Sequence, residues 1–199
     1  GSAKTNGVMV SKYDHCLQDL FSRHQYGELN ADIALVVSNH PDLRSLAEDF
    51  NTPYFHVPVN KDNKAESEKA TLKLFEEHQV DFVVLARYMQ ILTPLVLGRY
   101  PNKIINIPPS LLPGFPGPQP YRQAHEHGVK IAGVTAHFVS MHLDEGPIIA
   151  QESFRIKPGM TLKQIVAAGQ KLESKALVNG IRLYLTKQLD VYWGVVKEV

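Results

Sequence analysis

Short apolar runs alternate with amphipathic stretches along most of the chain. Apolar runs of roughly four to eight residues are typical of strands covered on both faces, and longer amphipathic stretches are typical of helices. The pattern therefore predicts an α/β fold with a mainly parallel twisted sheet and helices on both faces. The predicted strands are residues 8–11, 33–38, 54–56, 82–85, 104–107, 132–139 and 148–154, with a short strand or extension at 189–196.

The stretches between these strands predict helices over residues 15–24, 41–50, 65–79 and 161–185. Thr93 and Pro94 predict the start of a further short helix, because threonine caps helices and proline is tolerated at the first helical position. No internal repeat or long linker interrupts the chain, so we expect one catalytic domain over residues 1–199. Residues 1–2 resemble a cloning remnant, and the predicted first strand follows almost at once. We therefore expect this sequence to be a piece of a longer chain.

A proline-rich segment follows the strand at 104–107. Proline removes a backbone N–H and fixes φ, so this segment cannot be a helix or a central strand. It predicts a long, stiff loop at the carboxyl end of a strand, where open α/β sheets place their sites. Its prolines are Pro108, Pro109, Pro113, Pro116, Pro118 and Pro120.

Charge and cysteine content limit the possible partners. The chain has 21 Lys and Arg against 20 Asp and Glu, a net charge of +1, which argues against nucleic acid as a partner. No apolar run has the length of a membrane span, so we expect no membrane partner. Cys16 is the single cysteine, which excludes an internal disulfide and favours a reducing, cytoplasmic compartment. The single cysteine also argues against a zinc cluster built on cysteines, and we predict no metal.

Three polar residues stand out near strand ends. Asn106 alternates with isoleucines, so its amide either bonds neighbouring backbone or donates to a substrate carbonyl oxygen. Asp144 precedes Gly146, and a carboxylate there either forms a turn or acts as a general base. His137 shares one side of its strand with Thr135, and such a histidine alone is more often a core residue with its hydrogen bonds satisfied. The residues alone leave these alternatives open.

Two motifs in order resemble the formyl transferase superfamily, at residues 106–113 and 133–149. Four further segments resemble its formyltetrahydrofolate deformylase branch, namely residues 10–17, 37–43, 59–65 and 85–92. The resemblance covers nearly the whole chain and implies a Rossmann-like formyltransferase fold. It also implies a regulatory domain of the ACT type preceding this region, and self-association into a homo-oligomer.

The resemblance implies hydrolysis of 10-formyltetrahydrofolate to tetrahydrofolate and formate, with folate as substrate and no tightly bound cofactor. Asn106 would donate to the oxyanion, Asp144 would move the proton, and His137 and Thr135 would orient Asp144. The residues expected to bind substrate are Leu85, Arg87, Tyr88, Met89, Ile91, Leu92, Thr135, Val139 and His142.

This sequence departs from the family motif at Pro108. The family has a histidine two residues after the asparagine, and the deformylase branch usually has two in a row, where this chain has Pro108 and Pro109. Proline offers no side-chain donor to an oxyanion. Three explanations stay open: an active enzyme that relies on Asn106 and Asp144 with help from His142, a folate-binding homologue with lost chemistry, or a substitution made deliberately.

Formyl transfer to an amine acceptor such as glycinamide ribonucleotide is the alternative activity within the superfamily. The turn at residues 11–17 lacks the glycine that the transferases use to cradle a phosphate, which disfavours this alternative. The same turn has no G-x-G-x-x-G and no P-loop, so the sequence predicts no dinucleotide site there.

Overall fold

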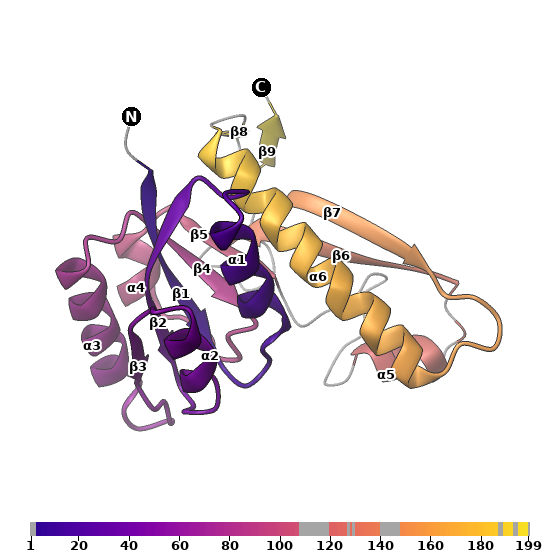
Figure 1. The fold of residues 1–199 in the computed structure, drawn as a ribbon, viewed down its shortest axis with the longest axis horizontal. Helices are drawn as coiled ribbons and strands as arrows, with labels where there is room; N and C mark the ends of the chain where they lie inside the picture. The colour runs from indigo at the N-terminus through magenta and orange to yellow at the C-terminus, as the bar shows by residue number, and fades with distance from the viewer. Residues whose placement is uncertain are drawn as a thin grey trace.

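A seven-stranded sheet organises the fold in this computed structural model, in the strand order β3-β2-β1-β4-β5-β6-β7 (Figure 1). The structure describes residues 3–107, 120–126, 128, 130–139, 148–186, 189–192 and 195–198. Neighbouring strands from β3 to β5 pair in parallel, and β6 pairs antiparallel with both β5 and β7. The predicted mainly parallel sheet is confirmed. The strands are β1 (Lys4–Val10), β2 (Ala31–Ser38), β3 (Tyr54–His56), β4 (Phe82–Ala86), β5 (Ile104–Ile107), β6 (Ile131–Phe138) and β7 (Ile148–Arg155).

Helices cover both faces of the sheet. One face carries α1 (His15–Gln25), α2 (Arg44–Asp49) and α6 (Leu162–Leu185), and the other carries α3 (Lys64–Glu77) and α4 (Pro94–Arg99). The helix α5 (Pro120–Glu126) packs against α6, which crosses β6 and β7 (Figure 1). Among the described residues, no helix combines the length and apolar character that crossing a membrane requires.

Two helices begin near the residues where the sequence predicted their starts, at Thr161 and at Thr93. The Thr161 hydroxyl accepts from the Gln164 N–H, and the Gln164 side chain accepts from the Thr161 N–H, which forms a capping box at the start of α6. The Thr93 hydroxyl accepts from the Leu95 N–H at the start of α4, with Pro94 in the first turn. Both predicted starts are confirmed.

Four elements differ from the sequence predictions by more than two residues at an end or in kind. The strand predicted at 8–11 starts at Lys4. The helix predicted from residue 41 starts at Arg44, because the Arg44 N–H first closes a turn on the Pro41 carbonyl. The helix α5 was not predicted, although it begins at Pro120, whose fixed φ suits a first helical position. The single tail element predicted at 189–196 is a pair of antiparallel strands, β8 (Leu189–Tyr192) and β9 (Val195–Glu198).

Strand register places one row of residues across the sheet on the α3 and α4 face. Partner residues on neighbouring strands point to the same face, so the row shares one environment. It is apolar through Val37, Met9 and Leu85 and becomes polar at Asn106 and His137. The fold therefore brings these two predicted site residues together at the end of an apolar row.

We predict that Gly7→Ala lowers the free energy of unfolding by about 1–3 kcal/mol, because a Cβ there would lie 2.7 Å from the Phe75 ring. Phe75 is fully buried and packs edge-on against Tyr100, so it has little room to move. Urea unfolding measures the change. Gly98→Ala is the matched control, since nothing lies within 4 Å of its Cβ position, and it should be neutral or stabilising. Equal stability of Gly7→Ala and wild type would contradict this account.

Candidate active site

Asn106 and His137 are direct antiparallel partners near the carboxyl end of β5. Directly opposed residues have Cβ atoms about 4.5–5.5 Å apart, so the amide and the imidazole are neighbours. Leu85 is the parallel partner of Asn106 on the other side. The site therefore begins with two polar side chains beside an apolar surface, an arrangement that can present hydrogen bonds to a mostly apolar ligand.

A backbone hydrogen bond determines which nitrogen of His137 can accept. Nδ1 lies 2.9 Å from the Phe138 carbonyl oxygen, which can only accept, so Nδ1 carries the proton. In its neutral form the ring therefore presents Nε2 as an acceptor. The residue is 7% exposed, so the ring is enclosed by its neighbours and keeps this hydrogen bond away from solvent.

The segment from 88 to 92 is held at both ends by buried polar groups. The Ser11 hydroxyl accepts from the Met89 N–H at 2.9 Å and donates to the Asn39 side chain at 2.6 Å. The Glu68 carboxylate accepts from the Thr93 hydroxyl at 2.7 Å and from the Thr93 N–H at 3.1 Å. These contacts fix the segment against β1 and α3.

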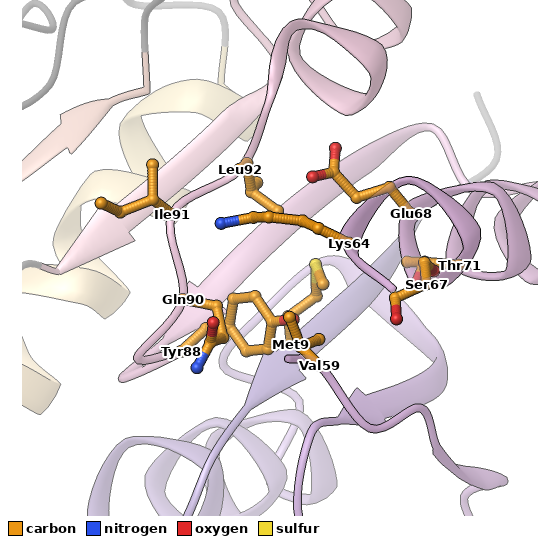
Figure 2. A pocket seen from close by; sticks show the side chains of 10 residues that line it. All are labelled: Met9, Val59, Lys64, Ser67, Glu68, Thr71, Tyr88, Gln90, Ile91 and Leu92. Atoms are coloured by element: carbon orange, nitrogen blue, oxygen red, sulfur yellow. The ribbon is translucent and has the colours of Figure 1, made fainter. Parts of the chain in front are cut away.

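A narrow pocket lies between this segment, the end of β1 and the start of α3 (Figure 2). Its volume is about 10 Å³, which is room for about one water molecule. Burial raises the pKa of the Tyr88 hydroxyl, and the nearby Glu68 carboxylate adds to this, so the phenol stays protonated. The lining residues are Met9, Val59, Lys64, Ser67, Glu68, Thr71, Tyr88, Gln90, Ile91 and Leu92.

Three of the residues expected to bind substrate line this pocket: Tyr88, Ile91 and Leu92. Leu85 lies in the apolar row beside Asn106, and Met89 is bound through its backbone to Ser11. The roles of all five as ligand contacts stay predictions.

Arg87 takes a direction that the sequence did not indicate. Its φ of 65° is in the left-handed region, which is uncommon for residues other than glycine. The side chain is 7% exposed and donates to Glu173 of α6 at 2.7 Å, on the α1 and α6 side of the sheet. The structure therefore shows Arg87 in an internal ion pair, and its contact with substrate stays a prediction.

Cys16 is a core thiol in the first turn of α1. It is 1% exposed, and burial raises its pKa to about 12, with the Glu173 carboxylate adding to the shift. A thiol with so high a pKa stays protonated and unreactive near neutral pH. The structure thus gives Cys16 a packing role.

The remaining predicted residues divide into two groups. Thr135 is half-buried on β6, and Val139 donates its N–H to the Ile104 carbonyl at 2.9 Å and packs on the α3 and α4 side of the sheet. Pro108, His142 and Asp144 lie outside the described residues. Within the described residues, no group of three His, Cys, Asp or Glu side chains could hold a metal ion.

Sequence reasoning missed Ser11, Glu68 and Glu173. Each forms its key contact with a residue distant in the sequence, and Glu68 and Glu173 lie on helices where a glutamate ordinarily faces solvent. The position of Glu173 within the apolar face of α6 was the available signal, because a carboxylate is almost never fully buried without a partner.

The sequence profile described as formyl transferase matches residues 6–181. The chain belongs to the formyl transferase family. Family members named formyltetrahydrofolate deformylase are similar over most of the chain. That of Synechocystis is 46% identical over 93% of this chain and 65% of its own length, and that of Bacillus subtilis is 43% identical over 95% and 63%. The chain thus spans a little under two thirds of the length of these relatives.

Solved structures of this formyl transferase family agree in fold. A formyltetrahydrofolate deformylase from Burkholderia mallei superposes with a TM-score of 0.95 at 41% identity, over 100% of this chain and 70% of its own. A glycinamide ribonucleotide transformylase from Symbiobacterium toebii superposes with a TM-score of 0.92 at 31% identity, over 100% of this chain and 95% of its own. The predicted formyltransferase-type fold is confirmed. The sequence identity is higher with the Burkholderia deformylase, at 41%, than with the Symbiobacterium transformylase, at 31%.

We predict that Glu68→Ala lowers the free energy of unfolding by about 1–3 kcal/mol, since the Thr93 N–H and hydroxyl would lose their buried acceptor. Chemical denaturation measures the loss. Glu76→Ala, an exposed change on the same helix, is the control and should stay within about 0.5 kcal/mol of wild type. A Glu68→Ala protein as stable as the control would show that this contact does not hold the segment.

Proposed function

We propose that this chain hydrolyses 10-formyltetrahydrofolate to tetrahydrofolate and formate. The observation that carries the proposal is the Asn106–His137 pair, which lies beside an apolar row leading to the pocket at Tyr88. Identities of 46% and 43% with proteins named formyltetrahydrofolate deformylase support the same substrate.

The proposed chemistry begins with the formyl carbonyl oxygen beside the Asn106 amide. Water adds to the formyl carbon, and the negative charge that develops on the oxygen is stabilised by the Asn106 N–H. Asp144 takes a proton from the water and delivers it to the folate nitrogen, so that the carbon–nitrogen bond breaks and formate leaves. The role of Asp144 rests on the family motif, because this residue lies outside the described part of the chain.

We assign His137 a positioning role. Because Nδ1 is occupied by the Phe138 carbonyl, neutral His137 can accept through Nε2 from a water O–H or from the Asn106 amide. A bond from Nε2 to the Asp144 carboxylate would require the imidazolium, since a carboxylate is only an acceptor. His137 thus orients the attacking water or the oxyanion donor.

The pterin ring is proposed to lie along the segment from 88 to 92. A flat heterocycle suits an apolar slot with few polar groups, and Ser11 and Glu68 hold that wall in place. The proposed substrate contacts are Leu85, Tyr88, Met89, Ile91, Leu92, Thr135, Val139 and His142, and the proposed assembly is a homo-oligomer.

Formyl transfer to an amine is the second candidate, favoured by the fold of the Symbiobacterium transformylase. Its identity of 31% is lower than that of the deformylases, and the turn after β1 reads Ser11, Lys12, Tyr13, Asp14 without a glycine. We therefore prefer hydrolysis.

We expect the protein to release formate from 10-formyltetrahydrofolate without any acceptor. Asn106→Ala should lower kcat by about 10²–10³-fold, because one oxyanion donor is lost. Formate and tetrahydrofolate are quantified with and without an amine, and a thermal melt of the variant checks that the fold is kept. Release that requires the amine would support the transferase, and folate binding without turnover by the wild type would overturn both activities.

Pro108→His should raise kcat by up to about 10²–10³-fold, because an imidazole two residues after Asn106 adds a donor near the oxyanion. Pro116→His, in the same proline-rich segment, is the control for the effect of replacing a proline there with histidine. Both variants are compared in the formate assay. An unchanged rate for Pro108→His would show that this position does not limit the chemistry.

A further inference from the structure

Five polar or aromatic side chains pack together beyond the carboxyl ends of β1 and β4, and we call them the switch-point cluster: Tyr13, His15, Arg87, Tyr121 and Glu173. At its centre, Glu173 is 1% exposed and accepts from Arg87 and from His15 Nε2, each at 2.7 Å. The Arg87 guanidinium lies 4.4 Å from the Tyr13 ring centroid. Burial and a hydrogen bond to Glu173 raise the pKa of Tyr121, so its hydroxyl stays protonated.

The cluster occupies the point where the strand order reverses. The chain leaves β1 towards β2 on one side and leaves β4 towards β5 on the other, although β1 and β4 are neighbours. Open α/β sheets bind ligands in the crevice outside the strand ends at this point. Here His15 at the start of α1, Arg87 after β4 and Glu173 of α6 fill that crevice.

Arg87 has two energetically unfavourable features in this position. Arg87 has a φ of 65°, which a residue with a Cβ adopts only under constraint from its surroundings. Its buried Nε also has no hydrogen-bond partner among the described residues. Strained backbone and unpaired buried groups of this kind gather at functional sites, where the surrounding structure maintains them.

The two sides of the sheet differ at this edge. On the α3 and α4 side, the pocket is lined by Met9, and the register places Leu85 between Met9 and Asn106. On the α1 and α6 side, the buried side chains of Arg87 and Glu173 occupy the crevice. Arg87 follows Ala86, whose parallel partner Ile107 is the residue after Asn106, so the cluster borders the reacting edge.

We propose that the switch-point cluster excludes an amine-bearing second substrate from this edge, so that water is the nucleophile that reaches the formyl carbon. This inference rests on the proposed function. In hydrolysis the carbon–nitrogen bond to folate breaks and a carbon–oxygen bond to water forms. In transfer the new bond is to the amine nitrogen, whose proton passes to the folate nitrogen, and a second molecule must fit beside Asn106.

The double variant Arg87→Gly/Glu173→Gln tests this exclusion. Glycine adopts a φ of 65° without strain, and glutamine keeps hydrogen-bonding atoms for His15 while leaving no unpaired charge. Wild type and variant are incubated with 10-formyltetrahydrofolate and glycinamide, and the ratio of N-formylglycinamide to formate is measured. We expect the ratio to rise about tenfold or more in the variant, because the amine gains a place beside the formyl carbon.

Cys16 provides a second readout that needs no folate. It is the single cysteine and lies in the same buried region. The charge of Glu173 raises the pKa of its thiol and the charge of Arg87 lowers it. Opening the crevice should raise the rate at which iodoacetamide alkylates Cys16. Mass spectrometry of the intact protein measures this rate. Tyr13→Ala, which removes a ring that is 45% exposed, opens the crevice from outside with less risk to folding and should change both readouts in the same direction.

Arg23→Ala/Glu28→Gln is the control, since it removes an exposed Arg–Glu ion pair beside the end of α1 that lies away from the cluster. It should leave the product ratio and the thiol reactivity at wild-type values. Formate release by the wild type with an unchanged ratio in both cluster variants would overturn this inference alone, whether or not Cys16 becomes reactive. A wild type that formylates glycinamide as readily as the variants would also overturn it. Absence of formate release by the wild type would overturn the proposed function as well.

Discussion

The pairing of β5 between parallel β4 and antiparallel β6 is the constraint on which the site depends. It aligns Leu85, Asn106 and His137 in one row, although the chain between the first and last of them is more than fifty residues long. Because β6 runs antiparallel, its early residues extend past the carboxyl end of β5. One wall of the site is therefore a strand, whose position is fixed by backbone hydrogen bonds.

Short apolar runs set between amphipathic stretches were enough to predict the strands of the sheet and most of the helices. The isoleucines around Asn106 indicated a buried strand, and Thr93 and Pro94 marked the start of α4. These signals are local, since capping and strand alternation depend on residues within a few positions of one another. For the same reason they located Asn106 and His137 on strands without showing that the two are partners.

The contacts that shape the site were beyond such local signals. Ser11 binds the backbone of Met89, and Arg87 pairs with Glu173, each across more than seventy positions. The direction of Arg87 depends on a positive φ, which periodicity cannot reveal because it assumes regular backbone. A buried polar network becomes visible only when the strands and helices that supply it have been placed.

The helix α6 packs against β6 at Gly180 and reaches the switch-point cluster through Glu173. Gly180 lets it approach β6, where an added Cβ would lie 3.2 Å from that of Ala136, and Glu173 lies seven residues earlier. Seven residues are about two turns, so both positions lie on one side of a rigid rod about 10 Å apart. A larger residue at 180 would crowd Ala136, push this end of the helix away from β6 and change how Glu173 meets Arg87. The spacing between helix and sheet at one end thus sets the fit of an ion pair at the other, and mutations far from the strand ends can reshape the crevice.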